Sequence, residues 1–340
     1  MTGDFFLTNW LFLGMRWIYE TLQTYAGMQA GFTIFWTILL STLTIKGLTL
    51  FSDIKSRKSQ IKMQEIQPDL DKLKKKYAKD ARKLNEEQRK FMKERGVSSF
   101  GGCVPMLFTM PLFIMFIAAF RIWSNEQMLR LMLQLETNPE AGVEMFSSYK
   151  FLWINNIWRP DNISSSVIMT GEEFWRTFSA GKGFLSAAIE PQKFFFFTEN
   201  ADQLSALLLK MGFYVRDSSG ALQIAADNAL FLKCYDQLVA PCQELYTGYV
   251  NGWAALPILA GGTSFLSSWV MMRNQPAPAE GQPNTGKSMM YIGPIMSVFF
   301  CWSSAATFAL YWTFSNVITM LISMGINYSL KKKSKQVEVL

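Results

Sequence analysis

Hydrophobic and polar residues occur along this chain in long blocks. Four blocks are almost entirely apolar, at residues 31–51, 103–123, 253–272 and 289–325. About 20 apolar residues in a helix cross the ~30 Å hydrocarbon core of a bilayer, so the first three blocks each predict one span. The fourth block is too long for one span, and Trp302–Ala305 near its middle predicts a tight turn between a fourth and a fifth. The pattern therefore predicts an all-α polytopic membrane protein with five spans.

Residues 1–30 precede the first span and have a helical pattern of their own. Phe6, Trp10, Leu13 and Trp17 recur every three or four residues, on one helical face. This face predicts an amphipathic helix lying in the plane of the membrane interface, with a packed core helix as the alternative. The first ten residues lack a basic start and a small-residue cleavage site, so we expect no cleaved signal peptide. Either the N-terminus is exported uncleaved or a further segment precedes it.

Residues 52–102 form a basic segment, with fifteen Lys or Arg and eight Asp or Glu. Apolar residues recur along it at helical spacing, and 78–81 offers a turn, so we expect two antiparallel helices, a helical hairpin. Basic segments are retained in the cytoplasm, which assigns 52–102 and the tail 326–340 to that side. Five spans then place the loop 273–288 in the cytoplasm as well. The apolar stripes are Ile66, Leu70, Leu73 and Tyr77 on the first helix, and Leu84 and Phe91 on the second.

Residues 124–252 are acidic and are therefore predicted to lie outside the cytoplasm, together with the N-terminus. Within them, about 163–249 is expected to be an inserted α/β module that folds independently. Its predicted elements are a buried strand at Phe194–Phe197, helices around 204–211 and 225–239, and a helix cap at Asn200.

One charged residue, Lys46, lies inside the first apolar block. Helical spacing puts Thr42 and Thr49 on its face, at i−4 and i+3. A charge at the centre of a span costs about 2.5–3.5 kcal/mol on insertion scales, so it usually faces protein or water and has a function. The alternative is that Lys46, seven residues before Asp53, extends its side chain to the nearer interface.

Composition excludes several kinds of chemistry. The chain has no histidine, which removes Ser-His-Asp and Cys-His catalysis, and no Cys or carboxylate pattern predicts a metal. Residues 281–288 match GxxxxGK[ST] but lack the preceding strand that a phosphate loop needs. The net charge is +7, and its positive charges are concentrated in the segments predicted to be cytoplasmic, so we expect no DNA partner. Cys234 and Cys242 are a candidate disulfide, with two separate thiols as the alternative. We expect no enzymatic activity, no cofactor and no bound metal.

Several motifs match one family. The chain resembles the YidC-type membrane protein insertases, which have bacterial, mitochondrial and chloroplast members. The most specific patterns are GGC-x-P-x₄-MP, at Gly101–Pro111, and YW-x₂-SN, at Tyr311–Asn316. The matching stretches cover nearly the whole chain apart from about 163–249: IKGLTLFSDIKSRKSQIKMQEIQPDL (45–70), GVSSFGGCVPMLFTMPLFIMF (96–116), FLWINNI (151–157), LPILAGGTSF (256–265) and IGPIMSVFFCWSSAATFALYWTFSNVIT (292–319).

The resemblance implies a five-span core around a hydrophilic groove that is open to cytosol and lipid and closed outside. Lys46 stands where the family has a characteristic Arg, so the charge is kept but the planar five-donor fork is lost. Thr109 stands where relatives often have Gln. The expected groove residues are Lys46, Thr42, Thr49, Thr109, Ser315 and Asn316. The expected apolar surface for a substrate helix, the substrate slide, is Met110, Phe113, Phe116, Ile295, Phe299 and Phe300.

The implied function is an insertase and chaperone of the bacterial cytoplasmic membrane that works without nucleotide hydrolysis. Its expected partners are nascent membrane proteins, the lipid bilayer, the ribosome and the general secretion translocon. A small-solute or ion transporter or channel, with Lys46 in a polar cavity, is the alternative. A transporter usually has polar residues on several spans and often an internal repeat, and no repeat is visible here.

Overall fold

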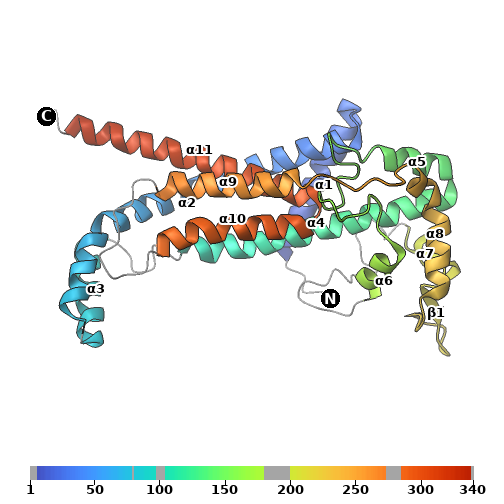
Figure 1. The fold of residues 1–340 in the computed structure, drawn as a ribbon, viewed down its shortest axis with the longest axis horizontal. Helices are drawn as coiled ribbons and strands as arrows, with labels where there is room; N and C mark the ends of the chain where they lie inside the picture. The colour runs from blue at the N-terminus through green and yellow to red at the C-terminus, as the bar shows by residue number, and fades with distance from the viewer. Residues whose placement is uncertain (1–5, 79, 97–103, 180–199, 273–284, 338–340) are drawn as a thin grey trace. The chain divides into compact units, whose positions relative to one another are not determined.

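The structure is a computed structural model that describes residues 6–78, 80–96, 104–179, 200–272 and 285–337 (Figure 1). The chain divides into two compact units. Unit 1 consists of Met1–Ser41, Met115–Ile258 and Phe299–Tyr311. Unit 2 consists of Thr42–Ile114, Leu259–Val298 and Trp312–Leu340.

The apolar blocks form helices. Three segments among the described residues are long and apolar enough to cross a membrane, namely Ala30–Lys55, Ala255–Met272 and Ala306–Ser329, and Met290–Ser303 is a shorter apolar helix. The protein is thus mostly helical with several apolar helices, as an all-α membrane protein requires. The helices that contain the predicted spans are α2 (Ala30–Lys76), α4 (Val104–Thr137), α9 (Ala255–Met272), α10 (Thr285–Ser303) and α11 (Ala306–Val337).

A break between α10 and α11 confirms the predicted turn within Trp302–Ala305. Only Ser304 and Ala305 separate the two helices. The first N–H groups of a helix have no partner inside it. At the start of α11, the backbone N–H of Ala306 donates to the Arg159 carbonyl at 2.9 Å, which satisfies one of these groups.

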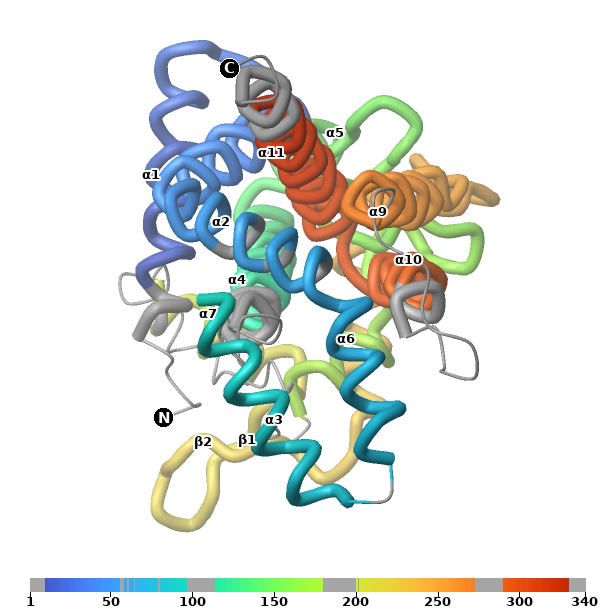
Figure 2. The backbone as a smooth tube through the Cα atoms, turned by 90° about the vertical axis from the view of Figure 1, so that its left-hand side faces the viewer, coloured from blue at the N-terminus to red at the C-terminus, as the bar shows by residue number. Residues whose placement is uncertain are grey.

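The predicted hairpin is present in unit 2, where α3 (Ala81–Glu94) folds back along the end of α2 (Figure 2). Ile66 and Leu70 form a small buried core against Phe91 and three other apolar side chains. The Asp80 carboxylate caps α3 by accepting from the Lys83 N–H at 3.0 Å. One detail differs from the prediction: the first hairpin helix continues the first predicted span as one 47-residue helix. Many of the residues that follow Phe51 are charged and suit water rather than lipid, but none of them at this boundary breaks a helix. The helix therefore continues from the apolar segment into the charged one.

Helix α1 (Phe6–Ala26) in unit 1 has one buried and one exposed face. Phe12 and Tyr19 pack edge-on against Trp123 of α4, with ring centroids 5.9 and 5.5 Å apart. Trp10 and Trp17, from the predicted aromatic face, are exposed. The helix is therefore held to unit 1 by one face while its tryptophans stay available to the surroundings.

The region between α4 and α9 contains short elements. They are α5 (Pro139–Ser147), α6 (Gly171–Ser179), α7 (Ala201–Lys210), β1 (Tyr214–Arg216), β2 (Leu222–Ile224) and α8 (Ala229–Glu244). The strands pair antiparallel, with Val215 opposite Gln223. Asn200 occupies the N-cap position of α7, but its side chain makes no capping hydrogen bond. The strand predicted at Phe194–Phe197 lies outside the described residues.

An aromatic cluster forms the centre of this region. The ring of Phe174 lies 5.7 Å from Phe213 and 5.5 Å from Tyr235, and the Tyr235 hydroxyl donates to the Met169 carbonyl at 2.6 Å. The region is not separate from the rest of unit 1, because Arg159 pairs with Glu173 at 2.7 Å across the predicted boundary at 163. The expectation that 163–249 folds independently stays a prediction.

The structure contradicts the candidate disulfide. Cys234 and Cys242 are free thiols, and both lie on α8. Eight residues of helix correspond to a rise of about 12 Å. A disulfide needs Cα atoms within about 7 Å of each other, so two cysteines at this spacing on one helix cannot be joined.

Candidate functional site

A polar stripe runs along α2 in unit 2. Thr42, Lys46, Thr49 and Asp53 follow one another at spacings of four, three and four residues, which places them on one helix face. Thr42 is buried, whereas the other three side chains are partly exposed. The stripe is therefore buried at Thr42 and partly accessible from Lys46 to Asp53.

Asp53 is a site residue that the sequence analysis did not assign. The Thr49 hydroxyl lies 3.2 Å from Asp53 Oδ2 and 3.4 Å from the Lys46 carbonyl oxygen of its own helix. The Asp53 carboxylate also attracts the Lys46 ammonium electrostatically. The spacing from Lys46 to Asp53, seven residues or two helical turns, is the signal that could have identified Asp53 as the counter-ion.

Asn316, predicted for the groove, links α11 to α9. Its side-chain amide nitrogen lies 3.3 Å from the Ala260 carbonyl oxygen and 3.4 Å from the Thr263 hydroxyl. Its neighbour Ser315 accepts from the Thr319 hydroxyl through its backbone carbonyl, at 2.7 Å. Amide hydrogen bonds of this kind hold helices together within a bilayer. The contacts of Asn316 thus give it a helix-joining role.

Four helices of unit 2 each bury a hydroxyl side chain. Ser297 donates to the Gly293 carbonyl of its own helix at 2.8 Å, which satisfies its hydroxyl locally. Small polar side chains are favoured where helices approach closely without a hydrophobic driving force. The buried side chains are Thr42 on α2, Ser267 on α9, Ser297 on α10 and Ser323 on α11.

The residues predicted for the substrate slide differ in exposure. Ile295 and Phe299 on α10 are 66% and 65% exposed, and Phe300 is partly buried. Phe116 is only 1% exposed and stacks on Tyr311 with ring centroids 3.7 Å apart, so it belongs to the core of unit 1 and is removed from the slide. The side chains of Thr109, Met110 and Phe113 lie outside the described part of α4.

A buried charge cluster in unit 1 joins α1 to α4. The Glu126 side chain is 1% exposed and pairs with Arg130 at 2.6 Å and with Arg16 at 3.6 Å. Burial raises the pKa of Glu126, and the two arginines act in the opposite direction. Arg16 also pairs with Glu20 at 2.7 Å. The sequence pattern does not reveal this cluster, because its members come from helices more than a hundred residues apart.

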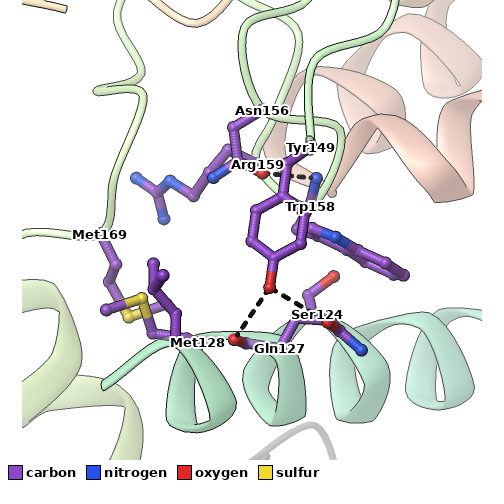
Figure 3. Close-up of a pocket in the computed structure, with 9 residues that line it drawn as sticks. Ser124, Gln127, Met128, Tyr149, Asn156, Trp158, Arg159 and Met169 are labelled. Carbon is purple, nitrogen blue, oxygen red and sulfur yellow. Dashed lines mark hydrogen bonds between the residues drawn. The ribbon is translucent and has the colours of Figure 1, made fainter. Parts of the chain in front are cut away.

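A small cavity lies beside this cluster, between α4 and the loop 149–169 (Figure 3). The Tyr149 hydroxyl points to Gln127 and donates to its side-chain oxygen at 3.1 Å. Burial raises the pKa of Tyr149 well above its ordinary value. The cavity has a volume of about 20 Å³, room for about one water molecule and far less than an organic ligand needs. Among the described residues, no group of three or more Cys, Asp or Glu could hold a metal ion.

Comparison with known families decides the classification. The model of the family described as 60Kd inner membrane protein matches residues 26–334. The chain belongs to this family. The match includes the polar stripe, the hairpin, the region 163–249 and all the apolar helices from α2 to α11, and it confirms the resemblance seen in the sequence motifs.

Individual relatives match over shorter stretches. A Clostridium perfringens protein named Membrane protein insertase YidC is 34% identical over 135 residues, which are 40% of this chain and 48% of that protein. The proteins of the same name from Clostridium tetani and Caldanaerobacter subterraneus are 33% and 34% identical over 124 and 149 residues. These matches cover 36% and 43% of this chain, and 47% and 58% of the two relatives. The chain thus spans about half the length of these relatives.

Proposed function

We propose that the chain is a membrane protein insertase and chaperone, which transfers nascent membrane proteins into the bilayer without nucleotide hydrolysis and without chemical catalysis. Family membership and the names of its relatives support this function. The observation that carries it is the position of Lys46, a partly exposed cation within an apolar segment long enough to span a membrane.

The physical problem is the transfer of a short polar tail across hydrocarbon. Each charge in the tail is costly at the centre of a bilayer. A hydrated groove that reaches Lys46 from the hairpin end of α2 shortens the apolar path that the tail must cross. The ammonium then attracts acidic residues of the tail, because electrostatic attraction is stronger in a medium of low dielectric constant.

Asp53 adjusts this attraction. Its carboxylate already attracts Lys46, so an incoming carboxylate must compete with it. Thr49 holds the Asp53 side chain on the same face through the 3.2 Å contact. The pair allows entry of an acidic tail and also its release, since the tail never leaves behind an uncompensated cation.

An apolar surface is needed for the substrate helix once its tail has crossed. Ile295 and Phe299 are exposed on α10 and supply such a surface, with Phe300 beside them. Met110 and Phe113 of α4 complete the proposed slide. Release into lipid follows from burial of the substrate's own apolar side chains, at about 25 cal/mol per Å².

The proposed topology has five spans in the bacterial cytoplasmic membrane, with the N-terminus outside and the C-terminus in the cytoplasm. The hairpin of α2 and α3 and the tail 326–340 then face the cytoplasm, where they can contact the ribosome or the general secretion translocon. The region 124–252 with its module lies outside. The distribution of basic and acidic residues supports this arrangement.

Transport of a small solute or ion is a second candidate, which the buried hydroxyls on four helices of unit 2 favour. One experiment separates the two. The purified protein is reconstituted in liposomes and supplied with a single-span substrate bearing a short acidic N-terminal tail, in the absence of nucleotide. We expect protease-protected insertion without leakage of entrapped ions or dyes. Ion or solute flux without insertion would overturn the insertase proposal.

A further inference from the structure

Two loops of unit 1, 151–167 and 249–256, are joined into one rigid layer, which we call the loop platform. Asn251 is at its centre. The Asn251 backbone N–H donates to the Ser165 carbonyl at 2.9 Å, and its carbonyl accepts from the Asn155 N–H at 3.0 Å. Its side chain makes two further hydrogen bonds to the backbone of Asn156, at 2.7 and 2.9 Å. These bonds fix the two loops to each other.

The loop platform also holds the ends of three apolar helices. α9 begins, α10 ends and α11 begins there, and two of these helices contain segments long enough to span a membrane. The platform therefore lies where the helices leave the hydrocarbon core. Three hydrogen bonds make the connections: the Leu256 N–H to Asp161 Oδ2 (2.8 Å), Asn162 Nδ2 to the Trp302 carbonyl (2.8 Å), and the Ala306 N–H to the Arg159 carbonyl (2.9 Å).

Four large apolar side chains of these loops are exposed. Leu152, Ile163, Tyr249 and Trp253 are exposed, from 55% for Leu152 to 73% for Trp253. We call these four residues the interfacial patch. Lys150, two residues before Leu152, is exposed beside it and provides a positive charge.

Backbone strain is concentrated at the same place. Leu152 and Ala254 are the non-glycine residues of the described chain with positive φ, at 51° and 62°. Leu152 occupies the tip of a two-residue turn closed by hydrogen bonds between Phe151 and Ile154, at 2.9 and 2.8 Å. Such conformations are disfavoured for side chains with a Cβ and persist where the surroundings impose them. Here the strained turn presents an apolar side chain to the outside, which is unfavourable in water.

We propose that the interfacial patch inserts into the boundary between headgroups and acyl chains of the lipid bilayer. Tyrosine and tryptophan are enriched at this depth because their rings combine an apolar body with a polar group. The adjoining membrane-crossing helices place the patch at that boundary, and Lys150 can face lipid phosphate. The patch then sets the depth of α9, α10 and α11 in the bilayer. This role in anchoring is separate from the proposed insertase activity.

The test measures depth directly. Single cysteines at positions 163 and 253, in a variant with the four native cysteines replaced, are labelled with an environment-sensitive NBD fluorophore. The control is Leu230→Cys, because Leu230 is also apolar, in unit 1 and 58% exposed but lies at the start of α8. In phosphatidylcholine–phosphatidylglycerol vesicles we expect blue-shifted emission at 163 and 253, with several-fold stronger quenching by lipids spin-labelled near the headgroup than at 230. Equal, weak quenching at all three positions would overturn the proposal.

A second measurement leaves the native cysteines in place. The photoreactive amino acid p-benzoylphenylalanine is introduced at position 253 or 230 of the purified protein in the same vesicles. Lipid adducts at 253 and none at 230, detected by mass spectrometry, are expected. Crosslinks from 253 only to a second copy of the chain would overturn the lipid assignment and identify the patch as a protein interface.

Discussion

The hydroxyl of Thr49 lies 3.2 Å from the carboxylate of Asp53, one turn further along α2. Asp53 is also the anion that acts on Lys46. The cation of the proposed groove therefore has a counter-ion on its own helix, and the strength with which it attracts a substrate depends on both residues. Two predictions follow from this relationship and two from unit 1.

Replacement of Lys46 tests whether its charge takes part in insertion. Lys46→Arg is expected to keep most of the activity because the charge is retained. Lys46→Ala and Lys46→Glu are expected to reduce insertion of substrates with acidic tails by roughly tenfold or more, which corresponds to ~1.4 kcal/mol of lost attraction. Substrates with neutral tails should lose less. The measurement is protease protection of matched acidic and neutral substrates in proteoliposomes.

Lys55→Ala is the matched control for this series, since Lys55 is an exposed lysine nine residues further along the same helix. If Lys46 only extends its side chain to the interface, Lys46→Ala will insert both substrates as well as the unmodified protein does. That result would remove Lys46 from the mechanism.

Neutralisation of Asp53 should have the opposite effect. Asp53→Asn removes the competing carboxylate, so we expect insertion of acidic-tailed substrates to rise about 1.5- to 5-fold relative to neutral-tailed ones, because the interaction of two partly exposed charges is worth no more than about 0.2–1 kcal/mol. Raised salt should diminish the difference. The control is Asp69→Asn, which removes a carboxylate paired with Lys72 on the hairpin part of α2. An equal change for both tails would show that Asp53 acts on folding alone.

We expect unit 1 to lose stability at alkaline pH because of Tyr235. Burial raises its pKa well above the ordinary value, so the folded protein keeps the proton at a pH where the unfolded chain loses it. Its contribution to stability is therefore complete below about pH 10 and is lost as the pH rises above that value. Tyr235→Phe should remove this pH dependence and should cost about 1–2 kcal/mol at neutral pH, because the Met169 carbonyl loses its donor.

Thermal unfolding in detergent at neutral and alkaline pH measures both effects of Tyr235→Phe. Tyr25→Phe serves as the control, because the Tyr25 side chain is largely exposed. An unchanged alkaline transition in Tyr235→Phe would assign the pH dependence to other tyrosines, among them the buried Tyr149.

The two cysteines of α8 should react separately. Burial raises the pKa of Cys242 to about 12, so its thiolate is scarce at mildly alkaline pH, while Cys234 is partly exposed. We expect iodoacetamide to modify Cys234 well before Cys242 in the folded protein and both equally after unfolding. Cys234→Ser should leave the melting temperature unchanged. A Cys234–Cys242 disulfide found by mass spectrometry of the oxidised protein would contradict the structure.

Helices and their breaks could be predicted from the sequence because their signals are local. The turn within Trp302–Ala305 follows from an apolar block that is too long for one span, and the hairpin turn follows from the interruption between two helical stripes. Exposure of apolar residues could not be predicted in the same way. Phe116 and Phe299 both lie in apolar helices whose faces are all apolar, so the sequence pattern does not distinguish core packing from exposure, although one is 1% and the other 65% exposed.

Contacts between distant segments were also missed. The sequence pattern assigns no role to Asp161, although it is buried and accepts hydrogen bonds from backbone N–H groups at the start of α9. A single polar residue in a loop has no periodicity that marks its partner. Asp53 differs from Asp161 in this respect, because its spacing of four residues from Thr49 and seven from Lys46 already places it on their face of α2.

The Asp161–Leu256 hydrogen bond joins two residues that are synthesised at different times. The two residues are 95 positions apart, and the carboxylate satisfies an N–H group in the first turn of α9 that the helix cannot satisfy on its own. During synthesis, Asp161 emerges from the ribosome long before Leu256. The carboxylate that completes the first turn of α9 is therefore made before α9 itself. The first turn of α9 is thus completed by a part of the chain that is synthesised 95 residues earlier.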